Sequence, residues 1–157
     1  MELLESVTSK RFPEDCTQGE RARLIPVTDW KETHLLGFFL SAFQAIPTFS
    51  LAVLNLIDGP KAKSQKVTCF TEVVFKSDKS GENRVDGLIE VTRGKRTWRA
   101  IVEAKMGNSS IEADQIERYL RLARENDVDA VITISNDFVS RPSESPVKVS
   151  GTLTRKV

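Results

Sequence analysis

The chain of 157 residues lacks most of the motifs that mark the common enzyme classes. It has one histidine, His34, so a site built from several histidine ligands is excluded. It also contains no G-x-x-x-x-G-K-[ST], G-x-G-x-x-G or G-x-S-x-G, the motifs that bind nucleotide phosphates or present a nucleophilic serine. These absences argue against nucleotide-binding folds, serine-nucleophile enzymes and metal sites with several histidine ligands.

Net charge, cysteine and long apolar runs are equally scarce. Lys and Arg number 23 against 22 Asp and Glu, so any basic surface must come from local clusters. Cys16 and Cys69 are the only cysteines, which favours reduced thiols over a disulfide framework. No apolar run reaches the roughly 18 residues needed to span a bilayer, and residues 1–10 lack the apolar core of a secretion signal. We therefore expect a cytoplasmic protein that is not bound to a membrane.

Two β-rich segments flank a short turn in the middle of the chain. Residues 84–92 and 97–105 alternate apolar with polar side chains, which predicts an antiparallel hairpin. If the first and last residues of the turn at 93–96 pair, then Asp86 faces Glu103. Side chains that face each other across two strands have Cβ atoms about 5 Å apart. The hairpin would therefore bring two carboxylates together.

Such a pair of ionised carboxylates repels by about 3 kcal/mol at an effective dielectric constant of roughly 20. A divalent cation removes this repulsion, and Mg²⁺ is bound by one or two carboxylates together with waters and substrate phosphates. Lys105 lies two residues after Glu103 and therefore projects from the same strand face. The alternative is a solvated sheet face with cross-strand charge pairs. A slip of one residue in the register would also turn Asp86 away from Glu103.

A helix and then a strand are expected after the hairpin. The S-x-x-E sequence from Ser109 to Glu112 is a capping box, which predicts a helix with Ser109 as its N-cap. Residues 129–135 form a short, nearly all-apolar run of β-formers, which predicts a buried central strand. Between them, apolar residues recur at helical spacing as far as about residue 126; they are Ile111, Ile116, Tyr119, Leu120, Leu122 and Ala123.

This arrangement resembles the PD-(D/E)XK nuclease superfamily, over roughly residues 66–135. The motifs match, in chain order, at Asp86, Glu103, Ala104, Lys105, Gln115 and Tyr119. The chain departs from the namesake pattern because Val85, not proline, precedes Asp86. The resemblance implies an α/β fold with a restriction-endonuclease-like αβββαβ core, in which helices flank a central mixed sheet, here with additional N-terminal helices.

The resemblance also implies a role for each matching residue. Mg²⁺, with Mn²⁺ as a substitute, would be bound by Asp86, Glu103 and the backbone carbonyl oxygen of Ala104. Lys105 would orient or activate the attacking water. Gln115 and Tyr119 would support the site or contact the nucleic acid. Tyr119 is at least as well suited to the core, because it belongs to the apolar row of its helix.

The whole chain is expected to form one domain, residues 1–157. Residues 66–135 would be its catalytic core, with a first strand at 67–76. The other expected segments are an irregular or partly helical lead-in at 1–28, a helix at 29–46, a second helix at 48–57 for which a strand is the alternative, and a loop at 136–157 that ends in an edge strand or is truncated.

Two residues of the first predicted helix could extend the site. Glu32 would be another acidic metal ligand, as the resemblance implies for this helix, but Asp29-x-x-Glu32 is also a capping box, and we favour capping. His34 could approach the metal, although a single helical histidine is more often a packing residue. Glu72 and Glu90, on predicted strands, could point toward the same site as secondary candidates.

Basic residues could contact the phosphates of a nucleic acid. The candidates are Arg93, Lys95 and Arg96 at the hairpin and Arg118 on the long helix, and the alternative for each cluster is a solvated surface. We predict a Mg²⁺-dependent nuclease that hydrolyses phosphodiester bonds, with DNA as the favoured partner. A catalytically inactive nucleic-acid-binding or assembly module is the alternative, and a purely structural domain is a third. A homodimer through the apolar N-terminal helices is left open.

Overall fold

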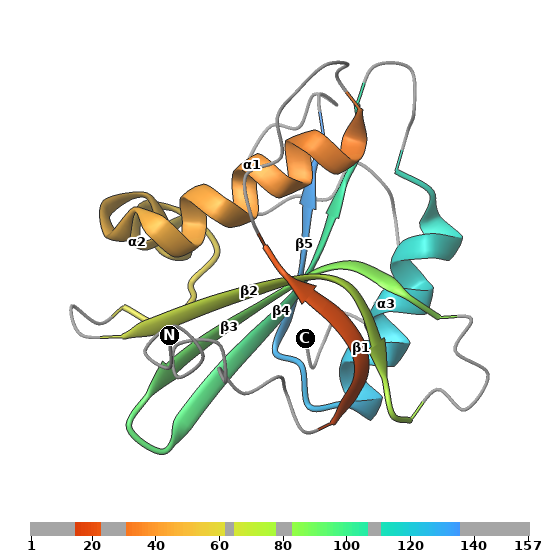
Figure 1. Ribbon diagram of the computed structural model, residues 1–157. Coiled ribbons are helices and arrows are strands. Elements are labelled where there is room, and N and C mark those ends of the chain that lie inside the picture. Colours follow the sequence, from red (N-terminus) through yellow and green to blue (C-terminus); the bar gives the residue numbers. More distant parts are fainter. Residues whose placement is uncertain (1–14, 23–30, 62–64, 78–82, 107–110, 136–157) are drawn as a thin grey trace, which may run out of the picture.

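The computed structural model describes residues 15–22, 31–61, 65–77, 83–106 and 111–135. These residues form an α/β fold in which helices flank one mixed sheet (Figure 1). The elements, in chain order, are β1 (Cys16–Arg21), α1 (Glu32–Ala45), α2 (Pro47–Leu56), β2 (Lys66–Phe75), β3 (Val85–Arg93), β4 (Arg96–Ala104), α3 (Ala113–Glu125) and β5 (Ala130–Ile134).

The sheet has five strands in the order β1-β2-β3-β4-β5. The pairs β1–β2, β2–β3 and β3–β4 are antiparallel, whereas β5 runs parallel to β4. A parallel pair needs a crossover connection, and α3 supplies it. The predicted hairpin is confirmed in its register, since Thr92 pairs with Thr97 and Leu88 with Ile101.

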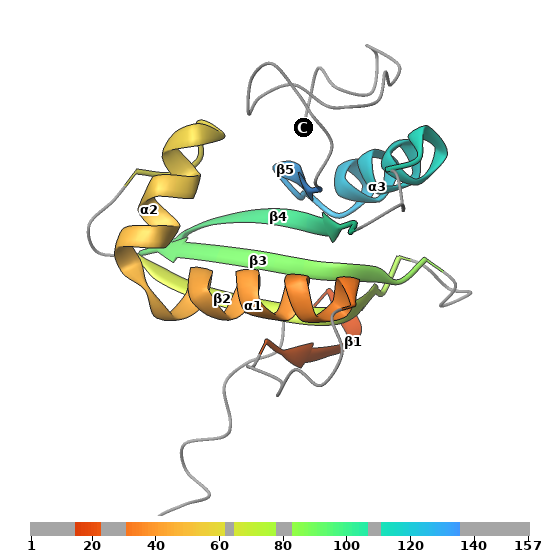
Figure 2. The same cartoon turned by 90° about the horizontal axis from the view of Figure 1, so that it is seen from above.

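Each face of the sheet is covered by different helices, as Figure 2 shows from above. On one face, Leu40 and Phe43 of α1 pack with residues such as Ile89 and Val102 of the hairpin. On the other face lies α3, and the buried cluster there includes Phe70, Leu88, Ile101, Tyr119 and Leu122. Because side chains alternate along a strand, Leu88 and Ile89 belong to different layers.

The two N-terminal helices meet at a sharp bend. Ile46 is both the C-cap of α1 and the N-cap of α2, and Pro47 stands at the first position of α2, where its missing N–H is tolerated. Of the helices described, none alone is long and apolar enough to cross a membrane. The pair α1 and α2 meets that test only when taken together, with a bend of 108° between them.

Several sequence-based boundaries were wrong. The lead-in predicted as irregular or partly helical contains β1, which pairs with β2. The strand β5 is not central: it lies at the edge of the described sheet and is only half-buried. Helix α3 begins at Ala113 with Glu112 as its N-cap, so the S-x-x-E sequence does not start it. Ser109 and residues 147–154 lie outside the described residues.

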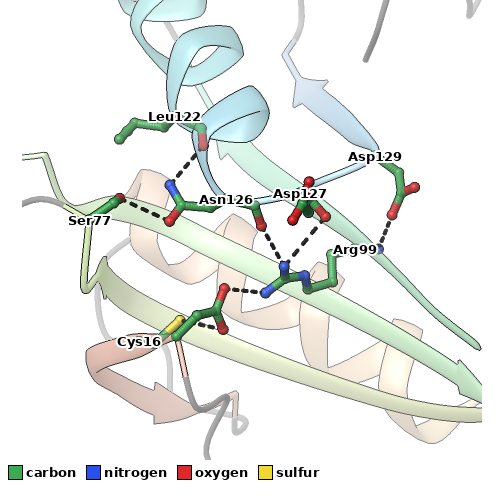
Figure 3. A network of polar contacts seen from close by, with 8 residues as sticks. Cys16, Ser77, Arg99, Leu122, Asn126, Asp127 and Asp129 are labelled. Atoms are coloured by element: carbon green, nitrogen blue, oxygen red, sulfur yellow. Dashed lines mark hydrogen bonds and ion pairs between the residues drawn. The ribbon is translucent and has the colours of Figure 1, made fainter. Parts of the chain in front are cut away.

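A polar network ties the C-terminal end of α3 to the sheet (Figure 3). Arg99 of β4 forms an ion pair with Asp15 and donates to the backbone carbonyl of Asn126, the C-cap of α3. The Asp129 carboxylate accepts a hydrogen bond of 2.8 Å from the backbone N–H of Arg99. With this end anchored, the N-terminal half of α3 lies beside the end of β4. The thiol of Cys16 is buried next to the network, and burial together with the charge of Asp15 raises its pKa to about 12.

Candidate active site

The two carboxylates of the predicted site lie at the open end of the β3–β4 hairpin. Gly87 pairs with Val102, so the next residue outward on each strand places Asp86 opposite Glu103. The two side chains are close enough for the charge of Glu103 to raise the pKa of Asp86. They project on the α3 side, because Leu88 and Ile101, two residues further along each strand, belong to the cluster under α3.

Glu103 is fully buried and is held by a tyrosine from α3. Its side chain is 0% exposed. The Tyr119 hydroxyl donates a hydrogen bond of 2.8 Å to Glu103 Oε2, and Gln115 Nε2 lies 3.4 Å from the same hydroxyl. Residues four apart on a helix share one face, so the Q-x-x-x-Y spacing aligns both side chains with the carboxylate.

Tyr119 is 1% exposed. It therefore lies in the core, the alternative that its place in the apolar row indicated, where a nucleic acid cannot reach it in this conformation; its hydroxyl donates to Glu103. Gln115 is half-buried and reaches Glu103 only through the tyrosine hydroxyl in this structure.

Lys105 joins the carboxylates from the end of β4. Its Nζ lies 3.1 Å from Glu103 Oε1 and 3.5 Å from Glu32 Oε2. Its backbone N–H donates to Ile134 of β5, which fixes the chain direction just after Ala104. Lys105 thus stands between two acidic side chains that come from β4 and α1.

Glu32 does not cap α1, contrary to our preferred interpretation. The N-cap is Lys31, whose N–H donates to His34 Nδ1 at 3.2 Å. Glu32 instead turns to the sheet, where its Oε1 accepts a hydrogen bond of 3.4 Å from the N–H of Met106. His34 serves the helix end and not the site.

Gly87 allows α1 to pack closely against the β3–β4 hairpin. A Cβ atom at Gly87 would lie 3.1 Å from Leu40 Cδ1 and 3.2 Å from Leu36 Cδ1. A larger residue would hold α1 further from the hairpin. The D-G sequence thus places a ligand-type carboxylate next to a position of close helix–sheet approach.

Three groups of the site have raised pKa values. Burial and then the charge of Glu103 raise the pKa of Asp86 to about 6. Burial and the charge of Glu103 raise the pKa of Tyr119 above its usual range, so the hydroxyl keeps its proton. Burial lowers the pKa of Lys105, but its hydrogen bond to Glu103 and the charges of Glu103 and Glu32 outweigh this, and the net direction is upward. Lys105 is therefore an ammonium ion at neutral pH.

The donor atoms suit a hard divalent cation in kind but are few. Oxygen ligands from one or two carboxylates are what Mg²⁺ takes. Burial and the charge of Glu103 raise the pKa of Asp86, and a bound cation would favour its ionised form. Ala104 lies between Glu103 and Lys105 at the end of β4, so its backbone carbonyl belongs to the same strand end. Among the described residues, however, no three Asp, Glu, His or Cys side chains converge into a metal-binding group.

The basic residues predicted to contact nucleic acid lie at two separate places, the hairpin turn and helix α3. Arg93, Lys95 and Arg96 are exposed at the hairpin turn, seven residues or more from Asp86 along β3, which is about 23 Å. The structure does not bring them to the carboxylates. Arg118 is exposed on α3, with its guanidinium carbon 5.3 Å from the centre of the Tyr119 ring.

The secondary candidates Glu72 and Glu90 have different surroundings. Glu90 faces Arg99 across the hairpin, four residues from Asp86. Glu72 lies on β2 in the position opposite Asp86 and forms an ion pair with Arg84. Arg84 was not selected from the sequence, although it lies only two residues before Asp86.

Comparison of the chain with protein-family models, with curated proteins and with solved structures found no significant match.

Proposed function

We propose that the protein is a Mg²⁺-dependent nuclease with a restriction-endonuclease-like core, and that it hydrolyses phosphodiester bonds of nucleic acid, with DNA as the favoured substrate. The observation that carries the proposal is the buried Glu103, which accepts a hydrogen bond from Tyr119, forms an ion pair with Lys105 and lies opposite Asp86 at the open end of the hairpin. Lys105 offsets one of the two negative charges, and a bound cation would offset the second.

The arrangement of elements supports the same proposal. Asp86 at the start of β3, Glu103 and Lys105 at the end of β4, and Gln115 and Tyr119 on α3 occupy the places that the resemblance to PD-(D/E)XK nucleases implies. The order of α1, three strands, α3 and a parallel strand agrees with an αβββαβ core.

Each residue has a distinct task in this proposal. Asp86 and Glu103, with the Ala104 carbonyl, would hold the ion, which when bound neutralises the scissile phosphate and the developing charge on its oxygens. Lys105, as an ammonium, would orient the attacking water and stabilise negative charge on the phosphate. Tyr119 would hold the Glu103 carboxylate in position, and Gln115 would orient the Tyr119 hydroxyl.

The test compares cleavage of DNA and RNA in Mg²⁺, in Mn²⁺ and with a chelator. We expect cleavage by the wild-type protein with either metal, and none for Asp86→Ala or Lys105→Ala at unchanged circular dichroism. Full activity in either variant would refute the assignment.

A catalytically inactive binding module is the second candidate. It is favoured by the small number of metal-binding side chains in the part of the chain that the structure describes. Salt-sensitive nucleic-acid binding without cleavage in either metal would support it in place of the nuclease.

A further inference from the structure

One residue beside the site has an unusual backbone conformation. Three non-glycine residues in the described ranges have positive φ: Asp58 at 53°, Glu72 at 58° and Asp127 at 51°. Asp58 and Asp127 each directly follow the C-cap of a helix, where the left-handed conformation is common. Glu72 lies inside β2, where residues with a Cβ rarely adopt it.

The alternation of side chains between the two faces of β2 is interrupted at Glu72. The pairing of β1 with β2 shifts register between Gln18 and Glu20, next to this position. Phe70 and Val73, three residues apart, both belong to the cluster under α3. This packing accounts for a bulge, but glycine would fill the strained position without cost. The presence of glutamate there is what needs an explanation.

The bulge directs Glu72 to Arg84. Asp86 is the residue opposite Glu72 on β3, because Thr71 pairs with Gly87 and Val73 with Val85. Arg84, two residues before Asp86, forms the ion pair with Glu72, and the charge of Glu72 contributes to the raised pKa of Asp86. The pair therefore lies at the edge of the candidate active site.

Stability alone does not explain this pair. The side chains of Arg84 and Glu72 are 52% and 40% exposed, and ion pairs this exposed stabilise a fold weakly. A left-handed non-glycine residue costs more than such a pair returns. Bulges and strained residues that persist in this way occur next to functional sites, where they re-aim a side chain.

We propose that Arg84 binds a phosphate of the substrate backbone next to the one held at Asp86 and Glu103, and that Glu72 is the positioning residue for the guanidinium. This inference rests on the proposed nuclease function. Two residues of extended chain span about 7 Å, so the Arg84 side chain can reach a phosphate next to the one at Asp86 on the same nucleic-acid strand. The planar guanidinium matches phosphate oxygens in a bidentate fork. The substrate class is thus a polynucleotide with consecutive phosphates, and a dinucleotide with one phosphodiester would not use this contact.

The test measures binding of a labelled duplex of about 20 base pairs by fluorescence anisotropy, in chelator and over a range of salt concentrations. Arg84→Gln should weaken binding about ten- to a hundred-fold and make the slope of log K against log salt shallower by about one. Arg84→Lys should keep the slope, because it keeps the charge. With Mg²⁺, Arg84→Gln and Glu72→Gln should raise KM for the duplex and leave kcat within about twofold.

Lys61→Gln is the matched control. Lys61 forms an ion pair with Asp58 after α2, and its side chain is 53% exposed, nearly the same as Arg84. Glu72→Gly separates the effect of the charge from that of the strain: it should raise KM as Glu72→Gln does while the thermal midpoint stays equal or rises.

The outcomes distinguish the two proposals. If Arg84→Gln and Arg84→Lys both bind like Lys61→Gln while Asp86→Ala abolishes cleavage, the role of Arg84 is overturned and the nuclease stands. If the wild-type protein neither binds nor cleaves nucleic acid, both proposals are overturned. Should Arg84→Gln fail to fold, Arg84→Lys and Glu72→Gln still decide, through KM and the salt slope.

Discussion

The hydroxyl of Tyr119 donates to Oε2 of Glu103 at 2.8 Å, and both side chains are almost completely buried. A carboxylate removed from water needs such a partner, because an unsatisfied buried charge is strongly destabilising. The contact joins α3 to the end of β4 and so couples the stability of the fold to the geometry of the candidate site.

We expect Tyr119→Phe to destabilise the protein by about 1.5–3 kcal/mol, the range for hydrogen bonds to charged groups. Urea unfolding at pH 8 measures this. Gln115→Ala is the control, since Gln115 contacts only the tyrosine hydroxyl among the contacts described here, at 3.4 Å, and should cost less than about 1 kcal/mol. Equal unfolding free energies for Tyr119→Phe and the wild type would contradict the assigned contact.

The ionisation of Tyr119 can be followed directly, because the chain has one tyrosine. Its pKa is raised by burial and by the charge of Glu103, so the near-ultraviolet absorbance of tyrosinate should not appear near pH 10. It should appear only at higher pH, together with the loss of circular dichroism. A reversible titration near pH 10 in the folded protein would show that the hydroxyl is solvated.

Asp86 should make the stability of the metal-free protein depend on pH. Its pKa rises from 3.8 to about 6 on folding, so folding favours the protonated form. The stabilising contribution is complete below pH 4 and is lost as the pH rises through about 6. Asp86→Asn, measured in chelator, should therefore gain stability relative to the wild type across this window, on the order of 1–2 kcal/mol once solvent screening of this half-buried group is included. A difference independent of pH would contradict the shift.

Metal binding should offset the negative charge of Asp86. Added Mg²⁺ or Mn²⁺ should raise the thermal midpoint of the wild-type protein at pH 8, because a ligand that binds only the folded state stabilises it. The Asp86→Asn variant should respond much less. Equal shifts in both proteins would place the ion elsewhere.

Gly87→Ala should destabilise the protein by about 1–3 kcal/mol, the usual cost of overpacking. The added Cβ would lie 3.1 Å from Leu40 Cδ1 and 3.2 Å from Val102 Cβ, both inside the buried layer. Gly94→Asn at the hairpin turn is the control: its φ of 60° is accessible to asparagine, and nothing lies within 4 Å. If both substitutions change the unfolding free energy equally, close approach of α1 at Gly87 is not the constraint.

The features that were predicted correctly from the sequence are those determined by residues near one another along the chain. The alternation of residues 84–105 around a glycine-bearing turn led to the correct hairpin register, and the helical spacing of Ile116, Tyr119 and Leu120 led to α3. Errors arose where local signals compete with tertiary packing. The S-x-x-E sequence did not start α3, and Glu32 turned from the helix end to the sheet.

Other features had no local signal. The strand β1 is formed by Cys16–Arg21, a short polar segment, because an edge of β2 was available to pair with it. Positive φ at Glu72 could not be expected from a glutamate in a β-rich run, since it follows from packing Phe70 and Val73 on one face.

The order of the residues was enough to place Asp86 opposite Glu103 and Lys105 beside them, because strand alternation and hairpin pairing are local rules with a period of two. Burial, and therefore charge, depended on the complete fold. Only when α1 and α3 close on the two faces of the sheet does Glu103 lose contact with water, Glu32 reach Lys105 and the pKa of Asp86 rise. Desolvation and cross-element contacts arise between segments far apart in the chain, and no local pattern encodes their distance.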